Sequence, residues 1–432
     1  MSDASIAQLL DYLNASPTPY HAVANAEQQL AQAGFRRLQE GDRWQLAPGD
    51  RIYVTRADAT LAAFILGQQP PSEAGFSLLG AHSDSPNLRL KPQAEFTRYG
   101  YNQFGVEPYG GVLLSTWLDR DLSLAGRLFV LRNGQPEAVL INLREPLLRI
   151  PNLAIHLNRS VNVEGLKLNP QQHLVPVLGL DANGGPSLLE RLATAATAAG
   201  TPVTPEQIIG SDLCLYDVQP ATLGGDQRAF IFGARLDNLA SCHAALFSLM
   251  HANGTSNCTR GIVLFDHEEV GSRSAQGANS PFLETTLGRI TAGLGDLDSD
   301  AMHRAMSKSL MISCDAAHAV HPNYAEMHDG NHRPLLGAGP VIKHNAGQSY
   351  ATDAESHAHF LQLCRSVDVT PQHFVTRSDL GCGSTIGPIS ASRLGMRTVD
   401  VGNPLLSMHS IREMAATADV HTMDKVLRAF FA

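Results

Sequence analysis

The stretch that decides the fold is Leu264-Phe265-Asp266-His267-Glu268-Glu269-Val270-Gly271-Ser272. Residues 262–265 form a short β-branched and aromatic run, which predicts a buried strand. Acidic residues follow directly, and ligands in open α/β sheets bind just beyond the carboxyl ends of the strands. On extended backbone the adjacent Glu268 and Glu269 point in opposite directions, so one can hold a cation while the other faces a substrate. The alternative is a solvated turn with two surface acids, because Glu is rarely buried unless it is paired.

The pattern of strands and helices along the rest of the chain predicts two domains. A chain of 432 residues exceeds what one core usually supports. From residue 230 onward, strand-like runs alternate with helical segments, which is typical of a mostly parallel sheet covered by helices. Residues 90–227 instead contain short β runs and a single clear helix, which indicates a β-rich second domain. The predicted class is therefore α/β with an additional β-rich part.

The composition argues against several kinds of partner. The net charge is −9 and Lys and Arg do not cluster, so we expect no nucleic-acid partner. No apolar run is long enough to cross a bilayer, so we expect no membrane partner. The six cysteines show no C-x-x-C pairing, and the N-terminal residues show no secretion signal. Both features favour a cytoplasmic protein with reduced thiols.

Five separated segments place side chains that can bind metals at predicted strand ends or in the loops that follow. Imidazole and carboxylate ligands without thiolates suit a catalytic zinc site, although cobalt or manganese accept the same atoms. The set exceeds what one ion needs, so we infer two, about 3.5 to 4 Å apart, sharing a carboxylate and a water. These segments are His82-Ser83-Asp84, Asp237-Asn238, Glu268-Glu269, Asp315 and His409.

A carboxylate outside the metal shell is also needed to move protons between that water and a leaving amine. Asp84, two residues beyond His82, is placed to accept the other ring N–H and fix the tautomer. This division of labour is typical of metal-dependent hydrolases.

Each of these residues also has an ordinary interpretation. Most of the 18 histidines must do nothing chemical, so His82 or His409 alone could be structural. Asp237 could cap the helix that follows it, and Asp315 could be a turn residue. The spacing of these residues in the sequence does not by itself show that they meet in the folded protein.

Long motifs at these positions resemble the aspartyl aminopeptidase family of co-catalytic dizinc metallo-aminopeptidases. The motifs lie in the family's order and cover nearly the whole chain. They are Ala81-His82-Ser83-Asp84-Ser85-Pro86, Arg235-Leu236-Asp237-Asn238, Glu268-Glu269-Val270-Gly271-Ser272, Asp315-Ala316-Ala317-His318-Ala319-Val320-His321-Pro322-Asn323-Tyr324, Asn331-His332-Arg333-Pro334, Gly381-Cys382-Gly383-Ser384-Thr385-Ile386-Gly387 and Met408-His409-Ser410-Ile411-Arg412-Glu413.

The resemblance implies a zinc-exopeptidase catalytic domain with a mixed, mostly parallel sheet covered by helices. That domain is discontinuous, formed by residues 1–88 and 233–432, and residues 89–232 form an inserted β-rich oligomerisation domain. It also implies a homododecamer built from dimers. In the family, a histidine of one subunit's inserted domain reaches a neighbour's active site, and His156 is the matching position. Without the resemblance, His156 would be interpreted as a strand residue facing the core of the second domain.

The resemblance also implies a role for each metal-site residue. Asp237 would bridge two zinc ions, with His82 and Asp315 completing one shell and Glu269 and His409 the other. Glu268 would be the general base that activates a metal-bridged water, with Asp84 behind His82.

The implied substrates are peptides with a free N-terminus, with a preference for acidic N-terminal residues. Lys343 matches the family's candidate cation for the first side-chain pocket, and Tyr350 matches a pocket tyrosine. Without the resemblance, an isolated lysine near a strand end would be interpreted as a surface residue. Its aliphatic chain would pack on the protein and its ammonium group would reach solvent. Arg273 stands where the family pattern leads us to expect an acid, which puts the substrate preference in question. The alternatives are a non-peptidase amidohydrolase or deacylase on the same site, and a non-catalytic assembly protein.

Overall fold

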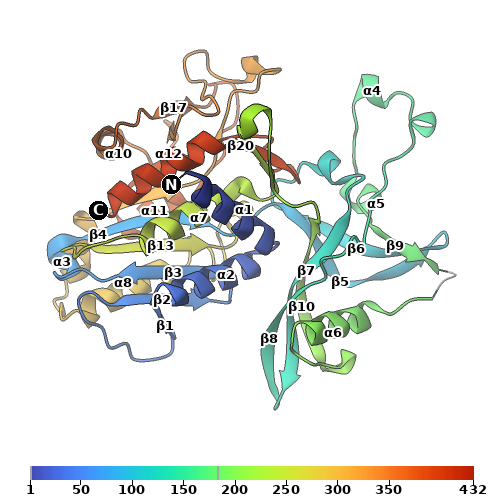
Figure 1. The fold of residues 1–432 in the computed structure, drawn as a ribbon, viewed down its shortest axis with the longest axis horizontal. Coiled ribbons are helices and arrows are strands. Elements are labelled where there is room, and N and C mark those ends of the chain that lie inside the picture. Colours follow the sequence, from blue (N-terminus) through green and yellow to red (C-terminus); the bar gives the residue numbers. More distant parts are fainter. Residues whose placement is uncertain (1, 182–183) are drawn as a thin grey trace.

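The structure is a computed structural model that describes residues 2–181 and 184–432. Its elements gather into two bodies joined through a narrow junction, as Figure 1 shows. One body holds a nine-stranded sheet between layers of helices, and the other is built on a six-stranded sheet from the middle of the chain.

The nine-stranded sheet is mixed and mostly parallel, as predicted. Its strand order is β1-β2-β3-β13-β4-β14-β18-β16-β17, and the four central strands β13, β4, β14 and β18 run parallel. Parallel strands end at the same edge, which gathers the residues that follow them. The strands are β1 (Arg36–Leu38), β2 (Arg51–Arg56), β3 (Thr60–Ile65), β4 (Phe76–His82), β13 (Thr259–Phe265), β14 (Leu310–Cys314), β16 (Val341–His344), β17 (Gln372–Val375) and β18 (Arg397–Gly402).

Helices cover both faces of this sheet, because its strands are apolar on both sides. Alternate residues of β13 divide between the two cores: Ile262 and Leu264 enter one, and Val263 and Phe265 enter the other. The first face is covered by α1 (Ser2–Ala15), α2 (Pro19–Gln32), α7 (Leu236–Met250), α10 (Ala354–Ser366) and α12 (Thr417–Phe430). The second is covered by α8 (Phe282–Gly293), α9 (Ala301–Ser307) and α11 (Ile386–Leu394), while the short α3 (Pro71–Ala74) contacts α9.

The second body has its own antiparallel sheet and its own core. Its strand order is β8-β7-β10-β5-β6-β9, and α6 (Leu188–Ala198) packs against β8. The strands are β5 (Asn87–Arg98), β6 (Tyr101–Tyr109), β7 (Leu122–Arg132), β8 (Gln135–Asn142), β9 (Val177–Leu180) and β10 (Ile208–Asp217). The short helix α4 (Val161–Glu164) projects from this body (Figure 1), and α5 (Pro170–His173) contacts β6.

The chain also forms a third sheet, of five strands. Its order is β11-β12-β20-β19-β15. In this sheet β11 pairs with β12, and β12 pairs with β20. Residues 222–224 and 230–232, which the predicted boundaries place in the β-rich part, therefore pair outside the six-stranded sheet. The strands are β11 (Thr222–Gly224), β12 (Phe230–Gly233), β15 (Ala317–His318), β19 (Pro404–Leu406) and β20 (Glu413–Ala416).

No helix in the described parts of the chain combines the length and the apolar character that a membrane span requires.

Candidate active site

The edge of the large sheet where the central strands end carries the polar residues singled out in the sequence. His82 is the last residue of β4, and Asp315 directly follows β14. Glu268 and Glu269 lie in a short 3-10 helix, Glu268–Val270, after β13. The expected extended backbone at this point is wrong, because His267 turns the chain with a φ of 60° and both glutamates then face the same cluster as His82.

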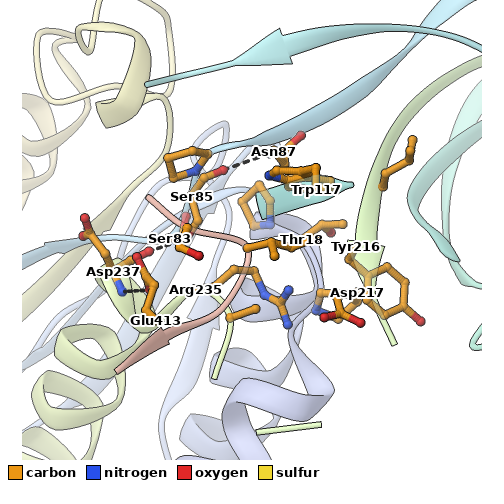
Figure 2. Close-up of a pocket in the computed structure, with 17 residues that line it drawn as sticks. Thr18, Ser83, Ser85, Asn87, Trp117, Tyr216, Asp217, Arg235, Asp237 and Glu413 are labelled. Atoms are coloured by element: carbon orange, nitrogen blue, oxygen red, sulfur yellow. Dashed lines mark hydrogen bonds between the residues drawn. The ribbon is translucent and has the colours of Figure 1, made fainter. Parts of the chain in front are cut away.

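Asp237 sits at the centre of this cluster, in the first turn of α7. Its backbone N–H donates to the Glu413 carboxylate at 3.0 Å, and its carbonyl accepts from Ser85 Oγ at 2.6 Å. Figure 2 shows Glu413 directly beside Asp237. The space behind them is nearly filled, with a cavity of about 20 Å³ that holds about one water. The buried Asp237 carboxylate therefore has a fixed position.

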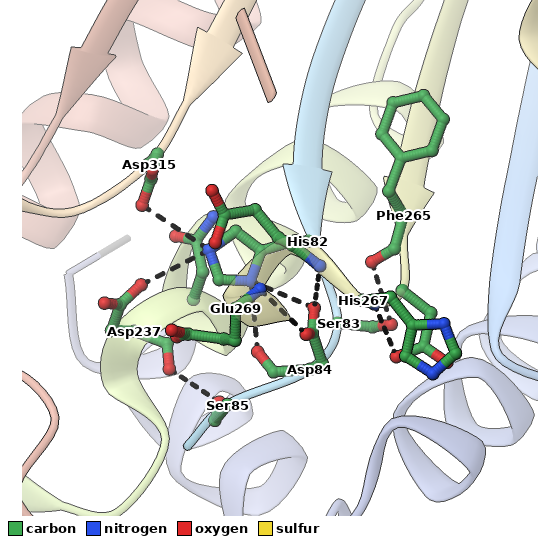
Figure 3. A network of polar contacts seen from close by, with 12 residues as sticks. His82, Ser83, Asp84, Ser85, Asp237, Phe265, His267, Glu269 and Asp315 are labelled. Carbon is green, nitrogen blue, oxygen red and sulfur yellow. Dashed lines mark hydrogen bonds and ion pairs between the residues drawn. The ribbon is translucent and has the colours of Figure 1, made fainter. Parts of the chain in front are cut away.

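The two oxygens of the Asp237 carboxylate face two different imidazoles. Oδ1 lies 3.5 Å from His82 Nε2, and Oδ2 lies 3.5 Å from His409 Nε2. His82 Nε2 is also 3.5 Å from Asp315 Oδ1, and His409 Nε2 is 3.4 Å from Glu269 Oε2. The structure thus brings all five predicted ligands together as two sets that share Asp237. Figure 3 shows His82, Asp237, Glu269 and Asp315 of these sets.

These separations fit metal coordination better than direct hydrogen bonds. A hydrogen bond between nitrogen and oxygen is usually about 2.7 to 3.2 Å long. Two ligand atoms bonded to one tetrahedral zinc at about 2.0 to 2.2 Å lie roughly 3.3 to 3.5 Å apart. In addition, the buried Asp237 Oδ1 and Glu269 Oε1 have no hydrogen-bond partner among the described residues. Buried carboxylate oxygens without a donor need a cation, so the residues present fit a pair of zinc ions.

The charge of the cluster leads to the same conclusion. Burial, with help from the neighbouring Asp315 and Asp84, raises the pKa of Glu268 to about 8. Burial and the charge of Asp237 likewise raise the pKa of Glu269 above its usual range and that of Glu413 to about 8. So many carboxylates do not ionise together in a buried site without compensating positive charge.

Asp84 orders the site differently from the prediction. His82 Nδ1 lies 3.0 Å from the backbone carbonyl oxygen of Asp84 and 3.4 Å from its carboxylate, so the carbonyl takes the ring N–H. The carboxylate instead accepts the backbone N–H groups of Glu268 and Glu269, both at 3.1 Å. It also accepts the Tyr109 hydroxyl at 2.6 Å. Asp84 therefore fixes the turn that carries both glutamates.

The residues that follow β6 pack against the second set of predicted ligands and orient His409. The carbonyl oxygen of Gly111 accepts from His409 Nδ1 at 3.0 Å, which leaves Nε2 facing Asp237 and Glu269. Gly110 has a φ of 74°, and a Cβ there would lie 3.0 Å from Glu269 Cβ. The chain after β6 therefore approaches too closely for a side chain.

Tyr109 and Glu413 are positioning residues that the sequence prediction missed. Glu413 accepts from both Asp237 N and His409 N, the latter at 2.8 Å, and so joins two ligands. The usable signals were weak: an acid at the start of β20 within the His409 motif, and an aromatic residue before two glycines.

The predicted pocket residues Lys343 and Tyr350 lie together beside Asp315. Lys343 is 2% exposed, so the surface-lysine interpretation is wrong. Its Nζ donates to the Ala316 carbonyl at 3.1 Å, lies 3.6 Å from Asp315 Oδ2, and stands 5.0 Å from the Tyr350 ring centroid. Arg273, after the glutamate turn, is exposed.

His156 is not part of this cluster within one chain. It lies in an exposed 3-10 helix, Ile155–Leu157, of the inserted body. Its alternative interpretation as a core-facing strand residue is wrong for the same reason.

Comparison with known proteins identifies the family. The family profile described as Aminopeptidase I zinc metalloprotease (M18) matches residues 12–431. The chain belongs to the M18 family. It is therefore a zinc-dependent aminopeptidase, which confirms the resemblance drawn from the motifs and leaves the deacylase and assembly-protein alternatives without support.

Relatives of this M18 chain align over nearly its full length. A probable M18 family aminopeptidase 2 from Azotobacter vinelandii is 50% identical over 424 residues, which are 98% of this chain and 97% of the relative. A cryo-EM structure of Ape4 in complex with Nbr1 superimposes with a TM-score of 0.96 at 41% identity, covering 100% of this chain and 86% of Ape4. The mApe1 dodecamer of S. cerevesiae gives a TM-score of 0.86 at 30% identity, covering 100% and 96%.

We expect the metal-free M18 chain to lose stability as the pH rises from about 5 to about 8. Glu268 and Glu413 have pKa values near 8 in the fold and near 4.5 when unfolded. The native state therefore binds more protons, and stability is lost as the pH rises through the folded pKa, on the order of a few kcal/mol. Thermal unfolding at pH 5.5 and pH 8.5, with and without saturating zinc, measures this. A metal-free midpoint that rises with pH as steeply as that of the zinc-loaded protein would contradict the expectation.

Proposed function

We propose that this aminopeptidase removes acidic residues from the N-terminus of peptides, using two metal ions and Glu268 as general base. The observation that carries the proposal is the Asp237 carboxylate, whose two oxygens face two separate imidazole and carboxylate sets. Under this proposal His82 and Asp315 hold one ion with Asp237, and Glu269 and His409 hold the other. Bound zinc, or cobalt or manganese with the same ligands, would polarise the scissile carbonyl and lower the pKa of the attacking water.

Glu268 is the carboxylate best placed to move protons. Burial and the nearby charge of Asp315 raise its pKa to about 8, although the neighbouring His82 acts in the opposite direction. Its backbone is fixed by Asp84, and no hydrogen bond from the described residues occupies its carboxylate. A carboxylate that is held in place but free can take a proton from water and deliver it to the leaving amine.

Lys343 supports a preference for acidic side chains. A lysine buried beside Asp315 and Tyr350 is a fixed positive charge close to the metal ligands. One of its three donors is used by the Ala316 carbonyl, which leaves capacity for a substrate carboxylate. Tyr350, buried against Phe374, would form a wall of the same pocket.

We also propose that the chain assembles through the inserted body. In this proposal residues 89–232 are the oligomerisation domain, and residues 1–88 and 233–432 are the catalytic domain. The segment around His156 exposes apolar side chains, including Leu157 at 76% and Val163 at 90%, and such clustering marks interaction surfaces. The related mApe1 forms a dodecamer, so a homododecamer built from dimers is the expected assembly. His156 would then reach the active site of a neighbouring copy.

A cytoplasmic location is part of the same proposal. None of the six cysteines forms a disulfide within the described residues, and Cys214, Cys242, Cys314 and Cys364 are buried thiols. Reduced cysteines of this kind fit a reducing compartment.

Replacing the proposed base separates proton transfer from metal binding. We expect Glu268→Gln to lower kcat on an aspartyl anilide by roughly 10²- to 10⁴-fold with two zinc ions still bound. The matched control is Glu269→Gln, which we expect to lose bound zinc. Wild-type turnover by Glu268→Gln with its metal retained would show that Glu268 is not the base.

Replacing Lys343 tests the substrate preference. We expect Lys343→Met to lower kcat/KM for an acidic anilide about 30-fold or more, since an uncompensated buried charge costs roughly 2 kcal/mol or more. Activity on a neutral anilide should persist, and Lys343→Arg should keep part of the acidic preference. Because Lys343 also contacts Asp315, zinc content is measured for both variants. Equal losses on both substrates, with zinc unchanged, would rule out the pocket role.

Replacing His156 tests the contribution of a neighbouring copy. We expect His156→Phe to keep its zinc and its assembly size but to lose activity. His303→Phe, an exposed histidine on α9, should behave as wild type. Activity and sedimentation velocity are measured on the same samples. A fully active monomer would contradict the proposal.

A further inference from the structure

Three histidines converge at a second place in the catalytic body, apart from the five ligands described above. His344 ends β16, His373 lies on β17 at the edge of the large sheet, and His357 lies near the start of α10. One ring nitrogen from each lies within 4.8 Å of the other two. None of these residues has a part in the proposed reaction.

The strand register explains why the three rings meet. In the parallel pairing of β16 with β17, His373 lies opposite Ile342, and His344 follows two residues later on the same face as Ile342. Ile342 belongs to the core on the α10 side of the sheet, together with Phe360 of α10. Both strand histidines therefore project toward α10, where His357 meets them. Lys343, between Ile342 and His344, points to the opposite face, toward Asp315.

The distances match a shared metal ion. His357 Nδ1 and His344 Nε2 are 3.3 Å apart, which is about the separation of two nitrogens bound to one tetrahedral zinc at about 2.0 to 2.1 Å. The ring centroids are 5.2, 5.7 and 5.3 Å apart for the three pairs, so no single pair stands alone. A hydrogen bond between two imidazoles would account for the 3.3 Å distance but not for the third ring.

His344 and His373 are also in the protonation state that a metal requires. Burial, together with the neighbouring His357 and His373, lowers the pKa of His344 to about 4. Burial and His357 lower the pKa of His373 as well. Both rings are therefore neutral at pH 7, and neutral imidazole is the ligand form.

We propose that His344, His357 and His373 bind a third metal ion, a first-row transition metal such as zinc, with water at the open position. Three imidazoles without a carboxylate select zinc or a similar ion over magnesium or calcium. Its role is structural: it ties the edge strand β17 and the strand that carries Lys343 to α10.

Metal stoichiometry tests the proposal on the full-length assembled protein. Chelator-stripped protein is saturated with zinc, passed through a desalting column and analysed for zinc per chain. We expect wild type to retain one ion more than His357→Ala and His373→Ala. The matched control His359→Ala, an exposed histidine on the same helix, should retain as many ions as wild type. Aminopeptidase activity of His357→Ala should stay within about two-fold of wild type.

Equal zinc content in wild type and both variants would overturn the proposal, whatever the number of ions in the dinuclear centre. The test reads a difference of one ion between folded proteins, so incomplete filling of the active site does not mimic it. Circular dichroism confirms that each variant is folded, and the second variant serves if the first fails to fold.

Discussion

The structure depends on the repulsion among buried carboxylates that the fold brings together, which a bound cation would offset. A parallel sheet brings the ends of β4, β13 and β14 to one edge, and acids follow each of these three strands within a few residues. Asp237, at the start of α7, lies among these acids, and its backbone is fixed by hydrogen bonds with Glu413 and Ser85. The carboxylates are too close and too buried to ionise together, as the raised pKa values of Glu268 and Glu413 show. Positive charge between them is what makes this arrangement stable.

The inserted body has a part in the same arrangement. Tyr109 donates to Asp84, and the backbone at Gly110 and Gly111 closes over Glu269 and His409. These contacts come from the last residue of β6 and from the loop that follows it. A segment that serves assembly in our proposal therefore also fixes the orientation of one ligand set. A change in the packing of this segment would be transmitted to His409 through its hydrogen bonds with Gly111 and Leu113.

Much of the fold could be predicted because its signals are local. The apolar runs of β4, β13, β14 and β18 and the ligands at or beyond their ends were all found by pattern. The turn at Glu268 was not, because a left-handed residue at His267 leaves no mark in apolar periodicity. The roles of Tyr109 and Glu413 depend on contacts between segments far apart in the chain, such as the 25 residues that separate Tyr109 from Asp84. The exposure of His156 and the burial of Lys343 likewise follow from packing, which the residue types alone do not specify.

The most direct measurement is anomalous diffraction at the zinc edge from crystals of the zinc-loaded protein. At the active site the account predicts two strong peaks about 3.5 to 4 Å apart, one beside each oxygen of Asp237, separate from any peak at the three-histidine cluster. His82 and Asp315 should contact the first peak, and Glu269 and His409 the second. A single peak at the active site, or a pair that does not touch Asp237, would contradict the account.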